Sequence, residues 1–258
     1  LAINLGWAVG GAIGGILASI NYHLLFWVDG ATNLVAALLL RIFLTPSAVT
    51  ASGSPAGTAG APARSAYKDR IYILFIVCTI LFAAAFFQMF SVLPVYYKRT
   101  LGLPEYMIGL LMTLNGLLIT LFEMVLVFKL EGRRESLFYI CCGVFLVGVS
   151  YCLLDLLPLS VFMPYLCMLL MTAGEITAMP FMNSFWISRT SPSNRGQYAG
   201  LYTIAWSTAQ VVGPAGGAGI AQHWGFRPLW WVVSGVCLLS VAGFRRLLQQ
   251  TKPIAHAG

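Results

Sequence analysis

Two glutamates lie inside long apolar stretches of this chain, where an ionisable side chain is costly and marks a candidate functional site. Glu175 has no other charged residue within ten positions on either side, and Glu123 lies six residues before Lys129. We predict both glutamates as proton-coupling residues. For Glu175 the alternative is a protonated, hydrogen-bonded residue that serves only packing. For Glu123 it is an ion pair with Arg133 or Arg134 that latches an inner gate.

Three amides and one aromatic ring extend the candidate site. Gln88, Asn115 and Asn183 are uncharged polar residues within the apolar stretches, and their amides are able to hydrogen-bond a substrate in a central cavity. Hydrogen bonds between neighbouring membrane helices are an equal alternative for each amide. Phe87 belongs to an aromatic group that also contains Met89, a composition that suits a cavity wall for apolar compounds. We therefore predict Gln88, Asn115, Asn183 and Phe87 as cavity residues.

Other kinds of chemistry find little support in the sequence. No nucleophile–base pair or nucleotide-binding loop is visible, so we predict that the protein is not an enzyme. The cysteines show neither Cys-x-x-Cys spacing nor a cluster with histidine, so we predict no disulfide, no metal and no cofactor. In apolar stretches cysteine acts as a small hydrophobic residue. The six cysteines are Cys78, Cys141, Cys142, Cys152, Cys167 and Cys237.

The composition places these candidates in a membrane. Of 258 residues, 59% are hydrophobic and 9% are charged, whereas soluble domains carry roughly 25% charged residues. The net charge of +7 does not form a stripe or an arm, so we exclude nucleic acid as a partner. The basic residues instead follow the ends of apolar runs, as in loops that flank a membrane. We predict the lipid bilayer as the main partner of the chain.

Eight apolar stretches are long enough to cross a bilayer, which takes about 20 residues per helix. Backbone groups in lipid must pair internally, so each stretch is predicted to be a helix. The predicted fold class is therefore all-α, a polytopic membrane helical bundle. The predicted spans are 3–21, 24–44, 71–95, 106–128, 136–157, 159–187, 197–221 and 226–244.

The loops between these spans alternate in charge. One side holds only Lys98, Arg99 and Arg227, and the positive-inside rule makes the other, more basic side cytoplasmic. Both ends of the chain are then cytoplasmic, and we expect the cell (inner) membrane as the location. The basic side holds Arg41, Arg64, Lys68, Arg70, Lys129, Arg133, Arg134, Arg189, Arg195, Arg245, Arg246 and Lys252.

Residues 45–66 are Ala, Gly, Ser, Thr or Pro in 20 of 22 positions, which is typical of a flexible linker. The linker leaves two helices before it and six after it, and glycines recur across it at an offset of 203 residues, from Gly10 to Gly213. We interpret this as a two-fold repeat of six-helix halves, in which four helices before Leu1 are missing. The predicted units are 1–44, a linker 45–69, a six-helix half 70–247 and a tail 248–258.

The repeated glycines resemble a known signature. Gly6-x3-Gly10-Gly11-x2-Gly14-Gly15 is similar to the fifth-helix antiporter motif of the major facilitator superfamily, with Gly11 in place of its proline. The resemblance implies that the spans correspond to family helices five to twelve. It also implies that small residues let helices pack closely and seal a gate. The candidates for gating and packing are Gly6, Gly10, Gly14, Gly15, Gly213, Pro214 and Gly217.

Two further stretches carry the resemblance. Lys129 to Arg134 looks like the loop motif of the second half of that superfamily, with Gly132, Arg133 and Arg134 as its matching residues. The stretch from Gly174 through Arg195 to Pro214 is similar to bacterial multidrug exporters of the drug–proton antiporter type. The arginines either stabilise one conformational state through ion pairs or only set the membrane topology.

The leading hypothesis from the sequence is a secondary active transporter that exports small hydrophobic or cationic compounds against protons. The alternative is a proton-coupled uptake symporter for a sugar, a peptide or another metabolite. The expected partners are lipid, protons and a small-molecule substrate, together with four helices of the same polypeptide that precede Leu1. We expect the full-length protein to be a monomer.

Overall fold

The computed structural model describes residues 2–43 and 65–251, which form helices without a strand in this part of the chain. The all-α prediction is confirmed, whereas most of the predicted linker and the last seven residues lie outside the described residues. In chain order the elements are α1 (Ala2–Ile20), α2 (Tyr22–Phe43), η1 (Ala66–Lys68), α3 (Arg70–Phe86), η2 (Phe87–Met89), α4 (Val92–Leu101), α5 (Glu105–Leu130), α6 (Ser136–Leu156), α7 (Phe162–Ser188), α8 (Arg195–Trp224) and α9 (Phe226–Thr251).

Six segments among the described helices are long and apolar enough to cross a membrane. They are α2, α3 through α4, α5, α6, α7 and α9. α1 contributes a shorter apolar stretch, Val9–Ile20, and α8 is 30 residues long with a mixed composition. Each of the eight predicted spans therefore falls on helical segments of the described chain, and six segments meet the length and composition expected of a membrane span.

The third predicted span is not one continuous helix. α3 ends at Phe86, a single 3-10 turn follows, and α4 runs on to Leu101, beyond the predicted end at residue 95. In the turn, the amides of Phe90 and Ser91 donate to the carbonyls three residues earlier, at 3.3 Å each. Pro94 has no N–H and cannot donate to the carbonyl of Phe90, so the α-helical ladder is interrupted at this point.

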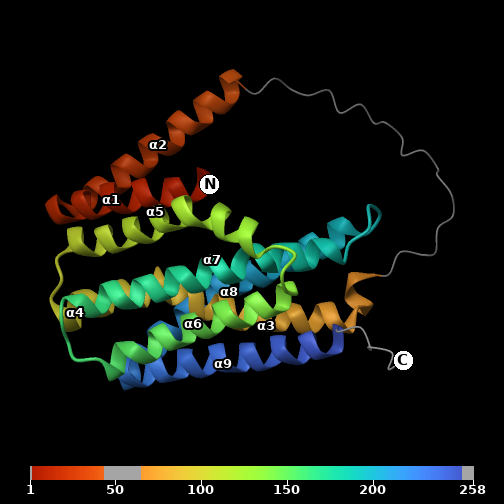
Figure 1. Ribbon diagram of the computed structural model, residues 1–258. Helices are drawn as coiled ribbons and strands as arrows, with labels where there is room; N and C mark the ends of the chain where they lie inside the picture. The colour runs from red at the N-terminus through yellow and green to blue at the C-terminus, as the bar shows by residue number, and fades with distance from the viewer. Residues whose placement is uncertain (1, 44–64, 252–258) are drawn as a thin grey trace, which may run out of the picture.

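The helices pack into one bundle in which α6 lies between α7 and α9, and α3 lies between α8 and α9 (Figure 1). α5 lies beside α7, α1 packs on α5, and α2 leads away at an angle (Figure 1). Small residues permit the closest of these contacts, because a Cβ atom on Gly174 would lie 2.6 Å from the carbonyl oxygen of Gly143. α6 and α7 therefore touch through their backbones.

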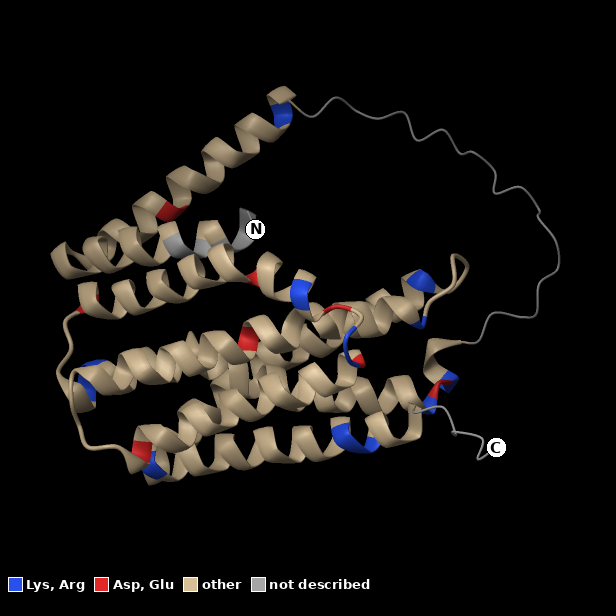
Figure 2. Ribbon diagram, viewed as in Figure 1, with Lys and Arg blue, Asp and Glu red and all other residues tan. Residues whose placement is uncertain are grey.

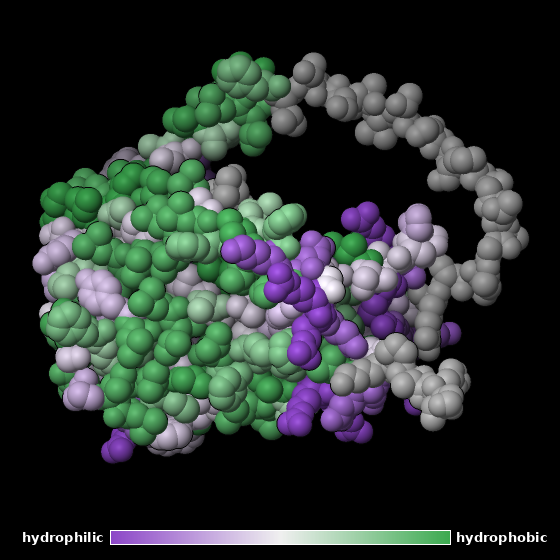
Figure 3. Space-filling model, viewed as in Figure 1, coloured by the Kyte–Doolittle hydropathy of each residue, from purple (hydrophilic) through white to green (hydrophobic). Residues whose placement is uncertain are grey.

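The surface matches a protein in lipid. Figure 3 shows an apolar band over the flank of the bundle, with hydrophilic residues gathered mainly at one end. No described residue of α2 is buried, and Phe128 and Phe162 are more than 80% exposed. Most Lys and Arg lie at the end where α3 begins and α7 ends, which we call the basic end (Figure 2). The opposite end, where α4 ends and α5 begins, is called the distal end.

Candidate functional site

α5 and α7 bring two predicted site residues into direct contact. The side-chain amide of Asn115 donates to Glu175 Oε2 at 3.0 Å and to Thr172 Oγ1 at 3.0 Å. Asn115 and Thr172 are buried, and Glu175 is partly buried. Thr172 and Glu175 are three residues apart on α7, so both side chains face α5. We call Asn115, Thr172 and Glu175 the amide–carboxyl cluster.

Glu123 lies eight residues, about two helical turns, beyond Asn115 on α5 and is partly buried. The two sequence candidates for proton coupling thus come from the two helices of the α5–α7 contact, Glu123 from α5 and Glu175 from α7.

Gln88 lies at a helix contact. Its amide nitrogen donates to the carbonyl oxygens of Gly213 on α8 at 2.6 Å and of Ala84 at 3.2 Å. The side chain is buried and fills the space beside Gly217, where a Cβ atom would collide with the amide group. Of the two roles considered from sequence, this geometry supports a hydrogen bond between helices.

Asn183 is exposed on α7, and its side-chain oxygen accepts a hydrogen bond from Trp186 Nε1 at 3.2 Å. Phe87 packs edge-on against Trp206 of α8, with ring centres 5.9 Å apart. Trp206 also meets Tyr202, whose ring stacks on Trp186 at 5.8 Å. Phe87 is thus part of an aromatic cluster that joins η2, α8 and α7. The members of the aromatic cluster are Phe82, Phe86, Phe87, Phe90, Trp186, Tyr202 and Trp206.

The glycines of α1 divide into two sets. Gly15 lies against Gly109 of α5, where an added Cβ atom would be 2.9 Å from the Gly109 Cα. Gly11 faces Met112 at 3.0 Å in the same way. We call these contacts between α1 and α5 the glycine seam. It crosses the two helices near the distal end, because Gly15 lies close to the end of α1 and Gly109 close to the start of α5.

The second set of α1 glycines faces more open space. A Cβ atom added to Gly6 or Gly10 would have no neighbour within 4 Å, and one added to Gly14 would meet only Leu25, at 3.9 Å. The spacing predicted close helix packing at every glycine of the α1 signature. In the structure, only Gly11 and Gly15 among these glycines approach α5 closely. In α8, a Cβ atom on Gly213 would lie 2.6 Å from the carbonyl oxygen of Ala84, so that glycine touches the backbone of α3.

The predicted loop residues lie at the basic end. Gly132 has a φ of +76°, which favours glycine in the turn between α5 and α6. Arg133, Arg134 and Arg195 are exposed, and the Arg134 guanidinium lies over the ring of Phe138 at 5.3 Å. Among the ion pairs of the described residues, these three arginines do not take part.

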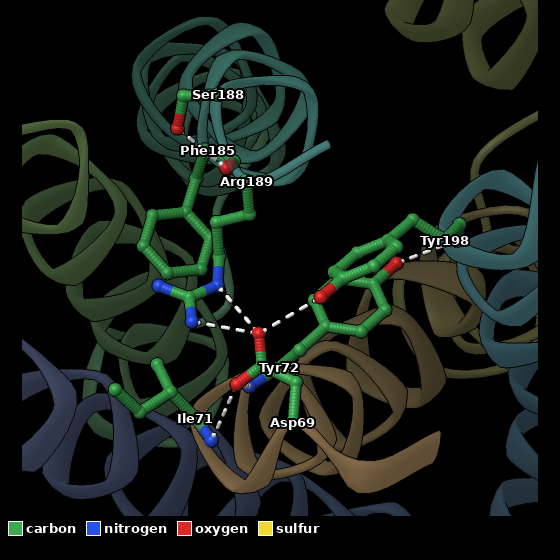
Figure 4. Close-up of polar contacts among 7 residues, drawn as sticks. All are labelled: Asp69, Ile71, Tyr72, Phe185, Ser188, Arg189 and Tyr198. Atoms are coloured by element: carbon green, nitrogen blue, oxygen red, sulfur yellow. Dashed lines mark hydrogen bonds and ion pairs between the residues drawn. The ribbon is translucent and has the colours of Figure 1, made fainter. Parts of the chain in front are cut away.

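An ion pair that the sequence reasoning missed joins three elements at the basic end (Figure 4). Asp69 Oδ1 accepts the backbone amides of Ile71 and Tyr72 at 3.1 and 3.2 Å, so this residue caps the start of α3. Its Oδ2 accepts Arg189 Nη2 at 2.7 Å and the Tyr198 hydroxyl at 3.0 Å. The Tyr72 hydroxyl in turn donates to the carbonyl of Tyr198 at 2.6 Å.

This network controls the charge of Asp69. Burial raises the pKa of the Asp69 carboxyl, but the hydrogen bonds from Arg189 and Tyr72 together with the Arg189 charge lower it by more, and the net pKa lies below its ordinary value of 3.8. Asp69 therefore remains a carboxylate at neutral pH. A sequence signal existed, because an Asp directly before an apolar helix is a capping pattern. Nothing in the sequence indicated Arg189 as its partner.

Comparison with known proteins places the chain in a family. The family model described as Major Facilitator Superfamily matches residues 1–214 and 132–257. The chain belongs to the Major Facilitator Superfamily. It is 23% identical to the "Uncharacterized MFS-type transporter YttB" of Bacillus subtilis (strain 168), over 94% of this chain and 61% of that protein.

Two other superfamily proteins match at similar levels. The "Na(+), Li(+), K(+)/H(+) antiporter" of Planococcus maritimus is 26% identical over 82% of this chain and 56% of its own length. The "Sugar efflux transporter A" of Escherichia coli (strain K12) is 24% identical over 93% of this chain and 60% of its own length. The chain thus spans about three-fifths of the length of the superfamily relatives that it matches.

Solved structures support the superfamily fold. A POT family transporter in complex with a thioalcohol-conjugated peptide superposes with a TM-score of 0.62 at 19% identity, over 70% of this chain and 41% of that one. A POT family transporter in complex with 5-aminolevulinic acid gives a TM-score of 0.58 at 20% identity, with the same coverage. The family match and the apolar helices together show a multi-pass membrane protein.

Proposed function

We propose that the protein is a secondary active transporter that exports small hydrophobic or cationic compounds in exchange for protons. The observation that carries the proposal is the amide–carboxyl cluster, in which Glu175 of α7 accepts a hydrogen bond from Asn115 of α5. Acidic residues inside membrane spans typically serve proton or substrate pathways. Two relatives, named as an antiporter against protons and as a sugar efflux transporter, support exchange and export.

Each residue of the cluster has a distinct task in this proposal. Glu175 binds the proton, and its neutral and ionised forms are both able to accept the hydrogen bond from the Asn115 amide. Thr172 holds that amide in place, because its oxygen accepts the second N–H of Asn115 while its own hydroxyl donates to the Met168 carbonyl at 2.8 Å. The carboxylate left after proton release pairs with a cationic substrate, so proton and substrate compete for one site.

The aromatic cluster suits the rest of such a substrate. Phe87, Tyr202 and Trp206 present ring faces and edges on η2 and α8, and aromatic faces attract cations as well as apolar groups. In this proposal Glu175 binds the charge of the substrate, and the rings provide contacts for its apolar body. Under the positive-inside rule the basic end is cytoplasmic, which puts both ends of the described chain on that side of the cell membrane.

The experiment uses inside-out membrane vesicles with an imposed proton gradient and a fluorescent lipophilic cation as the probe. An antiporter moves the probe against the direction of proton flow, whereas an uptake symporter moves it with the protons. Glu175→Gln is expected to abolish proton-driven transport and to weaken probe counterflow as well, because the variant lacks the carboxylate that pairs with the cation. Glu135→Gln is a matched control, because Glu135 is an exposed acid before α6. If Glu175→Gln retains full proton-driven transport, Glu175 is not the coupling residue.

A further inference from the structure

Three polar residues meet at the distal end of the bundle, each from a different helix. Tyr22 opens α2, Lys98 lies near the end of α4, and Glu105 opens α5. The Tyr22 hydroxyl donates to Glu105 Oε1 at 3.0 Å and accepts a hydrogen bond from Lys98 Nζ at 3.1 Å. Lys98 and Glu105 form an ion pair, and the Lys98 ammonium also lies 5.3 Å from the centre of the Tyr22 ring.

These contacts join α2 to α4 and α5, whereas the rest of the contact between the α1–α2 pair and the other described helices runs along α1 and α5. The pair formed by α1 and α2 packs against the other described helices through the α1–α5 contact, and α2 has no buried residue. The glycine seam and the Tyr22 contacts both lie at the distal end, because Gly15 precedes Tyr22 by only seven residues. The hydrogen bonds of Tyr22 therefore hold together the same end that the seam closes.

A cavity of about 750 Å³ lies directly inside this contact. Tyr22, Lys98 and Glu105 line it together with residues of the glycine seam such as Gly11 and Met112. Separation of α1 from α5 at the seam would widen this cavity at the distal end, and it would also have to break the Tyr22 contacts. The three residues of the polar contact thus form part of the cavity wall at that end.

We propose that Tyr22, Lys98 and Glu105 form a distal latch, which holds the α1–α2 pair against α4 and α5 and must break when the cavity opens at that end. The proposal rests on the proposed transport function, since an alternating cycle is what gives such a contact a role. The latch suits repeated opening. The Lys98 side chain is 49% exposed and that of Glu105 is 22% exposed, and an exposed ion pair is weak enough to break and form again in each cycle.

The test measures opening of the seam without any substrate. Met112→Cys places a thiol at the seam, and its labelling by a membrane-impermeant maleimide reports separation of α1 from α5. The full chain is used in right-side-out vesicles, with the same protein lacking the Met112→Cys change as the background for native cysteines. We expect labelling to rise roughly threefold with Tyr22→Phe and up to about fivefold with Glu105→Gln, as the loss of exposed hydrogen bonds and of an exposed ion pair implies.

Two further variants make the result specific. Lys98→Glu combined with Glu105→Lys restores the ion pair in reverse and is expected to return labelling toward that of the parent. Arg227→Gln is the matched control, because Arg227 pairs with Asp155 at 2.9 Å in an exposed contact between α6 and α9 that does not involve α1 or α2. It is expected to leave labelling unchanged.

The outcomes separate the latch from the proposed function. If Glu105→Gln and Tyr22→Phe label like the parent, or if Arg227→Gln raises labelling equally, the latch is overturned even where proton-driven transport is intact. If labelling responds as expected while no proton-driven transport is found, the latch stands and the transport proposal fails. If the charge-reversed double variant is labelled as fast as Glu105→Gln, the latch is also overturned, because the restored ion pair then does not keep the α1–α5 seam closed.

Discussion

Replacing Asp69 tests how strongly the basic end depends on one buried ion pair. Asp69→Asn keeps a side-chain oxygen that can cap α3, so the change removes the charge and leaves Arg189 without its partner. Breaking a buried ion pair costs about 3–5 kcal/mol, and the Arg189 side chain is 22% exposed, which lets water offset part of the loss. We therefore expect a loss of about 1.5–3 kcal/mol, which is the range for hydrogen bonds to charged groups.

The assay is thermal unfolding in detergent micelles at pH 7. A loss of this size lowers the midpoint by roughly 3–12 °C for a domain of this length. Asp155→Asn is the control: its pair with Arg227 is exposed on the arginine side, so the expected loss is below about 1 kcal/mol. The combined change Asp69→Asn and Arg189→Met is expected to recover part of the loss, because it removes the stranded charge. If Asp69→Asn unfolds at the midpoint of the parent, the network is not a source of stability.

The same variant predicts a dependence on pH. The folded-state pKa of Asp69 lies below the ordinary value of 3.8, so its contribution to the free energy of unfolding is fully present above that value. The contribution is lost as the pH falls through the folded-state pKa. The difference in midpoint between the parent and Asp69→Asn should therefore shrink as the pH falls below about 4, the ordinary pKa of Asp. A constant difference over that range would contradict the assignment.

Three other changes test the helix contacts and the cluster. Gly109→Leu should abolish transport while membrane insertion persists, because a Cβ atom added at this position would lie 2.8 Å from the Gly15 Cα. Gly10→Ala is the control: an added Cβ atom there has no neighbour within 4 Å, so this variant should retain most activity in the same vesicle assay. Gly217→Leu should likewise abolish transport by expelling Gln88 from its site beside α8, and transport by this variant would exclude that contact from the gate. Asn115→Leu removes the hydrogen-bond donor to Glu175 and should reduce proton-driven transport about tenfold or more, equivalent to roughly 1.4 kcal/mol. The pH profile of transport should also shift. An unchanged pH profile would show that Asn115 is not part of the coupling site.

The helices could be located well from the sequence because apolar length is a local property. The fifth predicted span, 136–157, matches α6 at Ser136–Leu156, where charged and turn-forming residues bound the apolar run. The break after Phe86 was missed, although Pro94 carried a signal for it, since a proline interrupts the ladder a few residues earlier. The last helix was predicted to end at residue 244 and continues to Thr251, because Arg245 and Arg246 extend it past its apolar part.

Contacts between distant segments were harder to predict than the helices themselves. Isolation of Glu175 in an apolar stretch identified it as a candidate, but only the packing of α5 on α7 shows that Asn115 is its hydrogen-bond donor. The glycine pattern of α1 indicated a close helix contact, and the partner, Gly109, lies in a stretch without a comparable pattern. Asp69 and Arg189 are 120 residues apart, and no local spacing relates them.

The backbone contact between Gly143 and Gly174 determines which side of the carboxyl site is free to move. Gly174, the residue directly before Glu175, is in backbone contact with Gly143 of α6. Because the two helices are already in van der Waals contact here, α7 has no room to move closer to α6 at this point. Displacement within the site must then come from α5, which reaches Glu175 through one side-chain amide. The Glu175 carboxyl group then keeps its position relative to α6, and the hydrogen bond from Asn115 lengthens when α5 moves away from α7.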